Sequence, residues 1–341
     1  MSVRATTVGA ALAMLGCLAA GCAGGSSASI SNPPSSSLPT TSAPSVTPKP
    51  TVTPAAPVAT LPLTGLGTTS KAMAAQRVMA AALSASYGQT QPTGASLAET
   101  VYVEYSDTVR MLALYQSVAA AAIGPIAQTR PVDGPILGFL HPGYANAGGP
   151  VGFVTTLDQS AVSDLSTTAD PSAYTAGASG QMTSTAALRK STATTPAAPP
   201  LFTFGSPDAP LAKTAKTAHT VTVSVAGFPA VTWNYDAKSG RWHTTDQVMS
   251  AGSPTSLVFQ QVSYKTVQLH HPDGAIVPSA RVFGSGVATV LSGPSAITGV
   301  WTKPGDVAVT VYADSTGVPL SFRPGVTWVL LIPSGTQVTY K

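Results

Sequence analysis

The chain contains very little cysteine. Only Cys17 and Cys22 occur among its 341 residues, and both lie close to the amino terminus. No disulfide can therefore cross-link the rest of the chain, and no other thiol is present to bind a metal or act as a nucleophile. If Cys22 carries a covalent modification, the chain has no disulfide, and burial of side chains alone must stabilise the fold.

Charged side chains are also scarce, at 9% of residues against about 25% in a typical globular protein. The formal net charge is +4, but the basic residues are scattered, and the longest basic run is Arg189-Lys190. A protein that binds nucleic acid clusters its basic residues in order to neutralise many phosphates along one track. We therefore expect no nucleic-acid partner, whereas weak attraction to anionic cell-wall polymers is compatible with this charge.

Long apolar runs are missing after residue 22. None approaches the roughly 20 residues that a membrane-spanning helix needs. The sequence therefore predicts a folded body that does not cross a membrane.

The first 22 residues have the pattern of a lipoprotein signal peptide. A short positive start precedes an apolar core from Val8 to Ala20, and Leu18-Ala-Ala-Gly21-Cys22 resembles a lipobox. We expect a lipid such as palmitate on Cys22, which would anchor the protein to the cell membrane on its extracellular side. Two alternatives stay open: modification of Cys17, and a plain secretory signal without a lipid.

Residues 23–60 consist almost entirely of Ser, Thr, Pro, Ala and Val. Such a segment cannot bury enough apolar surface to fold, and its prolines favour extended polyproline II. At about 3.1 Å per residue it could reach on the order of 100 Å. We predict a disordered tether that holds the folded part away from the membrane.

The remaining chain is predicted to be α+β, with a mixed α/β domain at residues 61–195 and a mainly β domain at 201–341. Alternating Val221, Val223 and Val225 mark a half-buried strand in the second domain. The first domain contains two apolar runs, Val101–Tyr105 and Val109–Tyr115, which predict a hairpin. Upstream, the Ala-rich run from Lys71 to Ser86 is helical by propensity, with Ser70 as cap and Gly88 as end.

Four ionisable residues make the hairpin and the loop after it the best candidate site. Glu104, Asp107, Arg110 and Arg130 lie there in a chain with few charges. A ligand-binding cleft is one interpretation, since the planar fork of arginine suits carboxylates and phosphates. The other is a cross-strand ion pair between Glu104 and Arg110 with a purely structural role.

No complete catalytic or cofactor motif accompanies these residues. Gly284-Ser285-Gly286 lacks the spacing of a nucleophile elbow. Adjacent His270 and His271 would point to opposite faces of a strand, so a solvated turn is favoured over a metal site. We expect no metal, no cofactor and no catalytic residue, although a Ser/His/Asp set assembled only in space stays possible. The four tryptophans, all after residue 230, are expected to be core anchors.

An ordered series of short motifs resembles the YerB-like lipoprotein family, whose domains have no known function. The motifs are Pro62-Leu-Thr-Gly-Leu66, Val101-Tyr-Val-Glu104, Arg110, Ile123-Gly-Pro125 and Arg130, then Trp233-Asn-Tyr-Asp236, Gly240-Arg-Trp242, Trp301-Thr-Lys303 and Pro324-Gly-Val-Thr-Trp-Val329. The resemblance implies both family domains, and it implies a strand where Gln76 to Ala85 lies, against the helical propensity. The chain departs from the family in two places. The hairpin turn is shortened, and the loop after Gly124-Pro125 keeps only Arg130 of the two arginines that the family has there. If these residues form the family's binding site, this chain has lost part of it.

Three functions follow as hypotheses. The first is a non-enzymatic binding or scaffolding lipoprotein that holds a cell-wall or small anionic ligand. The second is an envelope hydrolase with Glu104 or Asp107 as general base. The third is a protein–protein adaptor, which would present an exposed apolar patch instead of a polar cleft.

Overall fold

The structure is a computed structural model that describes residues 56–192, 197–268 and 276–341. The leader with Cys17 and Cys22, nearly all of the tether, and the His270-His271 pair lie outside the described residues. None of the helices found in the described parts is long and apolar enough to span a bilayer.

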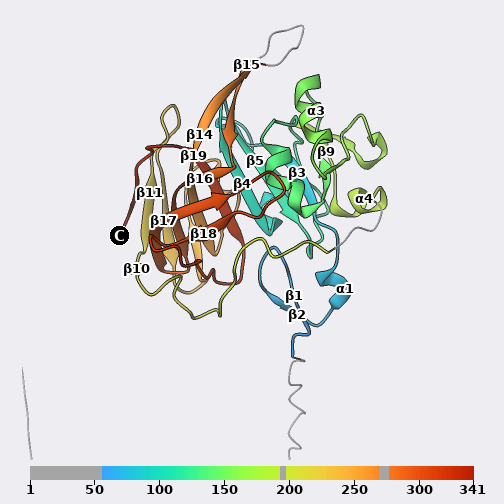
Figure 1. Ribbon diagram of the computed structural model, residues 1–341. Coiled ribbons are helices and arrows are strands. Elements are labelled where there is room, and N and C mark those ends of the chain that lie inside the picture. The colour runs from blue at the N-terminus through green and yellow to red at the C-terminus, as the bar shows by residue number, and fades with distance from the viewer. Residues whose placement is uncertain (1–55, 193–196, 269–275) are drawn as a thin grey trace, which may run out of the picture. The chain divides into compact units, whose positions relative to one another are not determined.

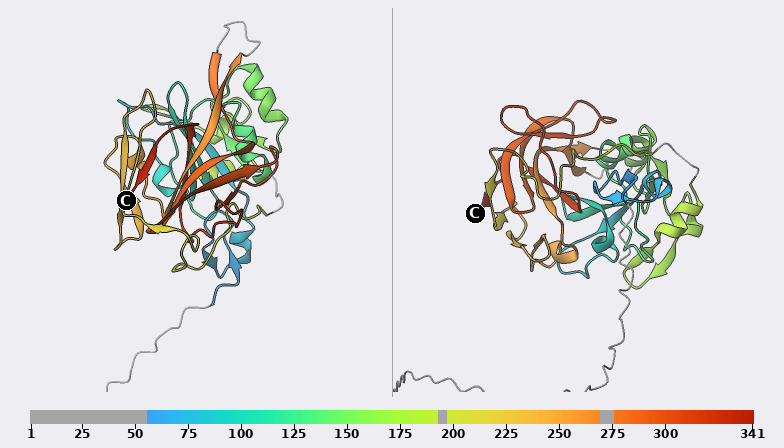
Figure 2. Two further views of the ribbon diagram at one scale, coloured as in Figure 1. Left: turned by 60° about the vertical axis from the view of Figure 1, so that its left-hand side comes forward. Right: turned by 90° about the horizontal axis from the view of Figure 1, so that it is seen from below.

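One 12-stranded sheet runs through both halves of the described chain, in the order β10-β17-β16-β14-β19-β4-β5-β3-β6-β7, with β15 paired to β14 and β18 to β17. Figures 1 and 2 show the orange and red strands continuing beside the teal ones. Its strands are β3 (Met79–Ser84), β4 (Thr100–Tyr105), β5 (Val109–Tyr115), β6 (Gly143–Ala145), β7 (Ser163–Asp164), β10 (Lys216–Thr217), β14 (Ser256–Gln268), β15 (Ile276–Arg281), β16 (Gly284–Ser292), β17 (Ser295–Lys303), β18 (Val311–Ala313) and β19 (Thr327–Pro333).

Three smaller sheets complete the β structure of the described residues. Their strands are β11 (Thr220–Val223), β12 (Val231–Asp236), β13 (Arg241–His243) and β20 (Val338–Tyr340) in a four-stranded sheet, and the two pairs β1 (Ala59–Thr60) with β2 (Gly67–Thr68) and β8 (Thr175–Gly177) with β9 (Gly180–Met182).

Helices are short and belong to the first half of the described chain. They are α1 (Lys71–Ala74), α2 (Asp133–Leu137), α3 (Val151–Asp158) and α4 (Thr185–Lys190), with 3-10 turns η1 (Ala95–Leu97), η2 (Gly138–Leu140), η3 (Pro171–Ala173) and, in the second half, η4 (Met249–Ala251). The predicted α+β class, mixed in the first half and mainly β in the second, is confirmed.

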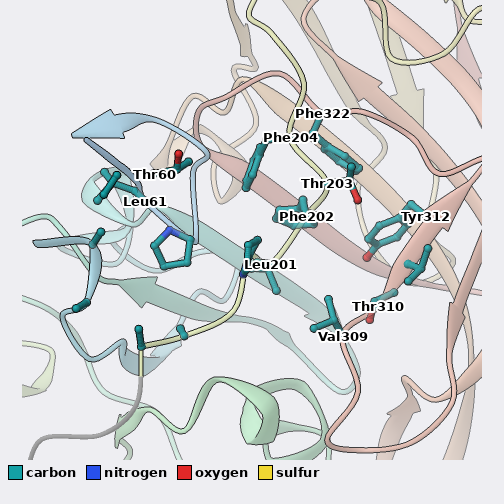
Figure 3. A pocket seen from close by; sticks show the side chains of 18 of the residues that line it. Thr60, Leu61, Leu201, Phe202, Thr203, Phe204, Val309, Thr310, Tyr312 and Phe322 are labelled. Carbon is teal, nitrogen blue, oxygen red and sulfur yellow. The ribbon is translucent and has the colours of Figure 1, made fainter. Parts of the chain in front are cut away.

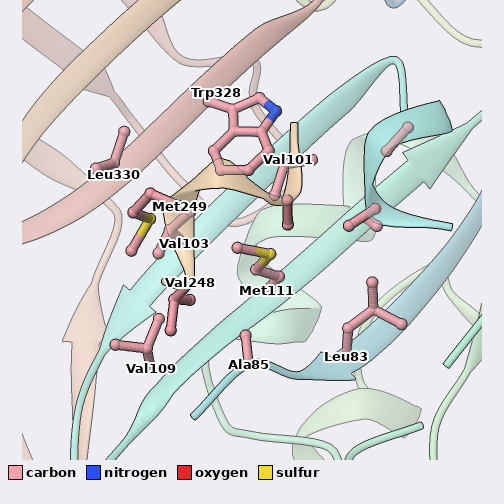
Figure 4. Close-up of a cluster of buried hydrophobic side chains, with 14 of the residues drawn as sticks. Leu83, Ala85, Val101, Val103, Val109, Met111, Val248, Met249, Trp328 and Leu330 are labelled. Atoms are coloured by element: carbon pink, nitrogen blue, oxygen red, sulfur yellow. The ribbon is translucent and has the colours of Figure 1, made fainter. Parts of the chain in front are cut away.

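The central strands are buried on both faces. Alternate residues of β4 and β5 enter two hydrophobic clusters on opposite sides of the sheet. Figure 4 shows one of them, in which Trp328 of β19 gathers with Val101 and Met111. Trp328 also meets Trp233 of the four-stranded sheet edge to face, at 5.7 Å between ring centroids. The tryptophans are core anchors, as predicted: Trp233, Trp242, Trp301 and Trp328 are all buried.

The predicted hairpin is confirmed, but the predicted helix from Lys71 to Ser86 is wrong. Ser70 does cap a helix by accepting a hydrogen bond from the Met73 amide at 3.1 Å, yet that helix ends at Ala74. Strand β3 follows, between β5 and β6, as the family resemblance implied. Its first five residues, Met79–Leu83, are fully buried, so sheet hydrogen bonds and burial on both faces outweigh the helical propensity of alanine.

Candidate functional site

Glu104 and Arg110 are direct partners across the β4–β5 hairpin. Their side chains lie on the face of the sheet that α2 and η2 cover, and they are only 4% and 5% exposed. Arg110 Nη1 lies 3.9 Å from Glu104 Oε2. The hairpin register therefore brings the predicted pair together, but inside the protein.

Asp133, at the start of α2, takes both terminal nitrogens of Arg110. Nη1 donates to Oδ1 at 2.7 Å and Nη2 donates to Oδ2 at 2.6 Å. The fully buried Asp133 also accepts hydrogen bonds from the Tyr144 hydroxyl, the Thr129 hydroxyl and the Arg130 amide. This fork-to-fork pairing occupies both terminal nitrogens with Asp133, so Arg110 cannot offer the same fork to a ligand.

Sequence reasoning missed Asp133 and Tyr144. Asp133 lies 23 residues after Arg110, and Tyr144 lies 34 residues after it. The available signal was an acid in the first turn of a possible helix, where the helix dipole favours negative charge.

Burial and neighbouring charges act in opposite directions on this network. Burial raises the pKa of Glu104 to about 7, although Arg110, Arg130 and a hydrogen bond from the Ala280 backbone favour its ionised form. Burial alone would lower the pKa of Arg110, but the adjacent Asp133 carboxylate outweighs it and the pKa is raised. Arg110 therefore stays charged, while Glu104 can exchange its proton near neutral pH.

Asp107, Arg110 and Arg130 line one cavity of about 470 Å³, which we call the polar hollow. The hairpin turn, the end of β3 and the loop after Pro125 form its walls, and serine and glutamine side chains supply most of its other polar groups. Arg130 Nη2 lies 3.2 Å from both carboxylate oxygens of Asp107. These two side chains are 18% and 51% exposed, so the pair sits at the open side.

Glu104 is not among the residues that line the polar hollow. Three of the four predicted site residues thus share one cavity, and the fourth lies behind it against Arg110.

Among the described residues, no group of three or more His, Cys, Asp or Glu side chains could hold a metal ion. The exposed His243 has Ser239 Oγ 3.1 Å from Nε2 and Ser253 Oγ 3.0 Å from Nδ1. Serine thus occupies both ring nitrogens, and no carboxylate orients the imidazole as a Ser/His/Asp set requires.

Replacing Asp133 by alanine should destabilise the protein far more than replacing Asp107. Asp133→Ala leaves a buried guanidinium without its partner, and we expect a loss of about 3–5 kcal/mol in the free energy of unfolding. Asp107→Ala breaks a solvent-exposed pair and should cost only about 0–1 kcal/mol. Urea denaturation measures both variants, and equal losses would contradict a structural role for the Arg110–Asp133 pair.

Glu104→Gln should change how stability depends on pH. The folded-state pKa of about 7 lies above the ordinary value of 4.5, so the native state binds more protons and stability falls as pH rises between these values. The glutamine variant lacks this titration. Its stability relative to the parent should therefore rise by up to about 3 kcal/mol from pH 4.5 to pH 7 and stay level above. A flat difference across this window in urea denaturation would refute the shifted pKa.

Comparison with known proteins places both halves of the chain in one family. Residues 63–198 match the N-terminal domain, and residues 220–329 the C-terminal domain, of a family described as "Protein of unknown function (DUF3048)". None of the curated proteins compared with the chain matches it in sequence.

A solved structure shares the fold. The crystal structure of the YerB protein from Bacillus subtilis matches with a TM-score of 0.68 and 17% identity, over 82% of this chain and 99% of that one. In this chain the N-terminal family domain is followed by the C-terminal family domain, and together they cover most of the sequence. The chain therefore belongs to the YerB-like family, whose function is unknown.

Proposed function

We propose that this chain is a cell-envelope lipoprotein that binds its ligand without chemical turnover. A lipid on Cys22 would anchor it to the outer face of the cell membrane. The predicted tether of residues 23–60 would be shorter by its last two residues, because Ala59 and Thr60 form strand β1. The leader, the lipobox-like Leu18–Cys22 and the Pro-rich composition support this part of the proposal.

The observation that carries the binding function is the Arg130–Asp107 pair at the open side of the polar hollow. An exposed ion pair of this kind contributes little to stability, so an incoming anion can displace Asp107 at small cost. Gln89 and Gln128 line the same cavity and offer both donors and acceptors. A guanidinium with amide and hydroxyl neighbours suits a sugar-like ligand with an acidic group, such as a fragment of the cell wall.

The hydrolase hypothesis has less support, because neither acid fits a general base. Glu104 has a suitable pKa near 7, but it is 4% exposed and lies outside the hollow. Asp107 is accessible, yet hydrogen bonds from Ser106 and Arg130 overcome the effect of burial and lower its pKa. A carboxylate with a lowered pKa is a weak base at neutral pH.

The adaptor hypothesis rests on a small feature. Val287 and Val300 are cross-strand partners on β16 and β17 that remain exposed, and Val311 of β18 is exposed nearby. Scattered apolar side chains of this kind are normal on protein surfaces, so binding at the hollow remains the favoured function.

Arg130→Ala should weaken binding of purified peptidoglycan fragments about tenfold or more, because a hydrogen bond to a charged group contributes about 1.5–3 kcal/mol. Isothermal titration calorimetry gives the affinities. The matched control is Arg241→Ala, which removes an exposed arginine from β13 and should leave binding unchanged. Unchanged binding by Arg130→Ala would refute this site, and fragment turnover that Glu104→Gln abolishes would establish the hydrolase instead.

Cys22→Ser should abolish incorporation of labelled palmitate and move the protein out of the membrane fraction. Cys17→Ser is the control and should change neither property. Metabolic labelling and fractionation of the producing cells measure both. Label retained in Cys22→Ser but lost in Cys17→Ser would move the anchor to Cys17, and no label in the parent would indicate a secreted protein without a lipid.

A further inference from the structure

A second cavity, of about 710 Å³, lies away from the polar hollow, and we call it the apolar cavity. Three distant parts of the chain form its walls: residues 59–75, the connector at 197–204, and the segment from Val309 to Phe322. No residue of the polar hollow contributes to it. A cavity of this volume fits a small molecule rather than a folded partner.

Aromatic rings in mutual contact form one wall of the apolar cavity (Figure 3). The ring centroid of Phe202 lies 4.8 Å from that of Phe322 and 6.1 Å from that of Tyr312. Phe204 meets Phe202 edge to face at 6.0 Å. The Tyr312 hydroxyl donates to Gln260 Oε1 at 2.7 Å, so its hydrogen bond is made elsewhere and its ring serves as apolar surface.

The loop on the other side is also held in place. The buried Lys303 ammonium donates to the Ala308 carbonyl and lies 4.9 Å from the centre of the Phe139 ring. Val309 and Thr310, which follow directly, line the cavity. A ligand would therefore meet an existing cavity, which lowers the entropy lost on binding.

Charge at the apolar cavity has one sign. Among its described lining residues only Lys71 is charged, and it is exposed on α1. Thr60, Thr203 and Thr310 add hydroxyl groups, and no carboxylate lines the cavity. An apolar interior with one cation and several hydroxyls complements a molecule that joins an apolar chain to an anionic head.

We propose that the apolar cavity binds the hydrocarbon chain of an amphipathic molecule with an anionic head group, such as an alkyl phosphate. The hydrocarbon chain of the ligand lies against Phe202, Phe204 and Phe322, and its head group contacts Lys71. This site is separate from the polar hollow. Its wall begins at Ala59, close to where the described part of the chain starts.

The test is calorimetric titration of dodecyl phosphate, below its micelle concentration, into the full chain carrying Cys22→Ser so that it bears no lipid of its own. We expect one molecule bound per chain. Inorganic phosphate should not bind, because it lacks the hydrocarbon chain. Dodecyltrimethylammonium should bind more weakly than dodecyl phosphate, because its head group is cationic. Arg130→Ala should leave dodecyl phosphate binding unchanged, which keeps this proposal distinct from the first.

Two variants probe the two ends of the ligand. Val309→Trp fills the cavity from a half-buried position and should weaken binding at least about tenfold. Lys71→Glu should weaken the binding of dodecyl phosphate and strengthen the binding of dodecyltrimethylammonium. The control is Lys190→Glu, which replaces an exposed lysine on α4 and should change neither affinity. Because Lys71 is exposed, its variant should fold even if the tryptophan variant does not.

Several results would overturn the proposal. They are absence of dodecyl phosphate binding, equal binding by Val309→Trp and the parent, or no change of head-group preference in Lys71→Glu. A dimer by light scattering that Val309→Trp dissociates would make the cavity an interface between copies instead. Tighter binding after deletion of residues 24–55 would make the tether its occupant.

Discussion

The parallel pairing of β19 with β4 joins the two halves of the chain. Thr327 to Leu331 lie in register with Thr100 to Glu104, and β14 continues the parallel arrangement on the other side of β19. Strands β4 and β19 are buried on both faces, as parallel strands usually are. The two family domains therefore share one sheet and two hydrophobic clusters. Strands of that sheet contribute residues to both cavities.

A second constraint acts on the same strands. Arg110 carries a full charge and is buried. The charge is tolerated because both terminal nitrogens of Arg110 donate to the Asp133 carboxylate, with Glu104 and Tyr144 beside them. This network connects the hairpin to α2 and to the loop that carries Arg130. The polar hollow is consequently built beside a fixed internal charge, and among its described charged residues Arg130 and Asp107 are the two that reach solvent. Recognition by Arg130 suits this arrangement better than proton transfer by the enclosed Glu104.

The apolar cavity shows how the two halves cooperate. Leu61 lies at the start of the first half, Phe202 belongs to the connector, and Phe322 lies just before β19. Aromatic contacts around Phe202 bring the last two together. The Leu201 amide donates to the Pro62 carbonyl and the Phe322 amide donates to the Thr203 carbonyl, so the connector holds the other two walls together. Lys303 fixes the loop on one side of the cavity.

Local pattern in the sequence was enough to predict the hairpin, since the apolar runs Val101–Tyr105 and Val109–Tyr115 flank a short polar turn. A hairpin at this place also allowed Glu104 to pair with Arg110. The alternation of Val221, Val223 and Val225 indicated the mainly β half, and the ordered motifs indicated the family. These features depend on residues that are close in the chain, or on order alone.

Only the tertiary structure decided the rest. The helical prediction for the residues of β3 was wrong, because β3 pairs with β5 and β6 and is buried between them. This pairing is a long-range effect that the helical propensity of alanine does not include. Asp133, rather than a ligand, became the partner of Arg110 because α2 folds back over the hairpin. The apolar cavity is formed by segments more than a hundred residues apart, and no local pattern encodes such a meeting. Sequence alone determined the hairpin and the four ionisable residues near it, because these lie close together in the chain. Packing between distant segments decided that Arg130 and Asp107 face a cavity while Glu104 is buried.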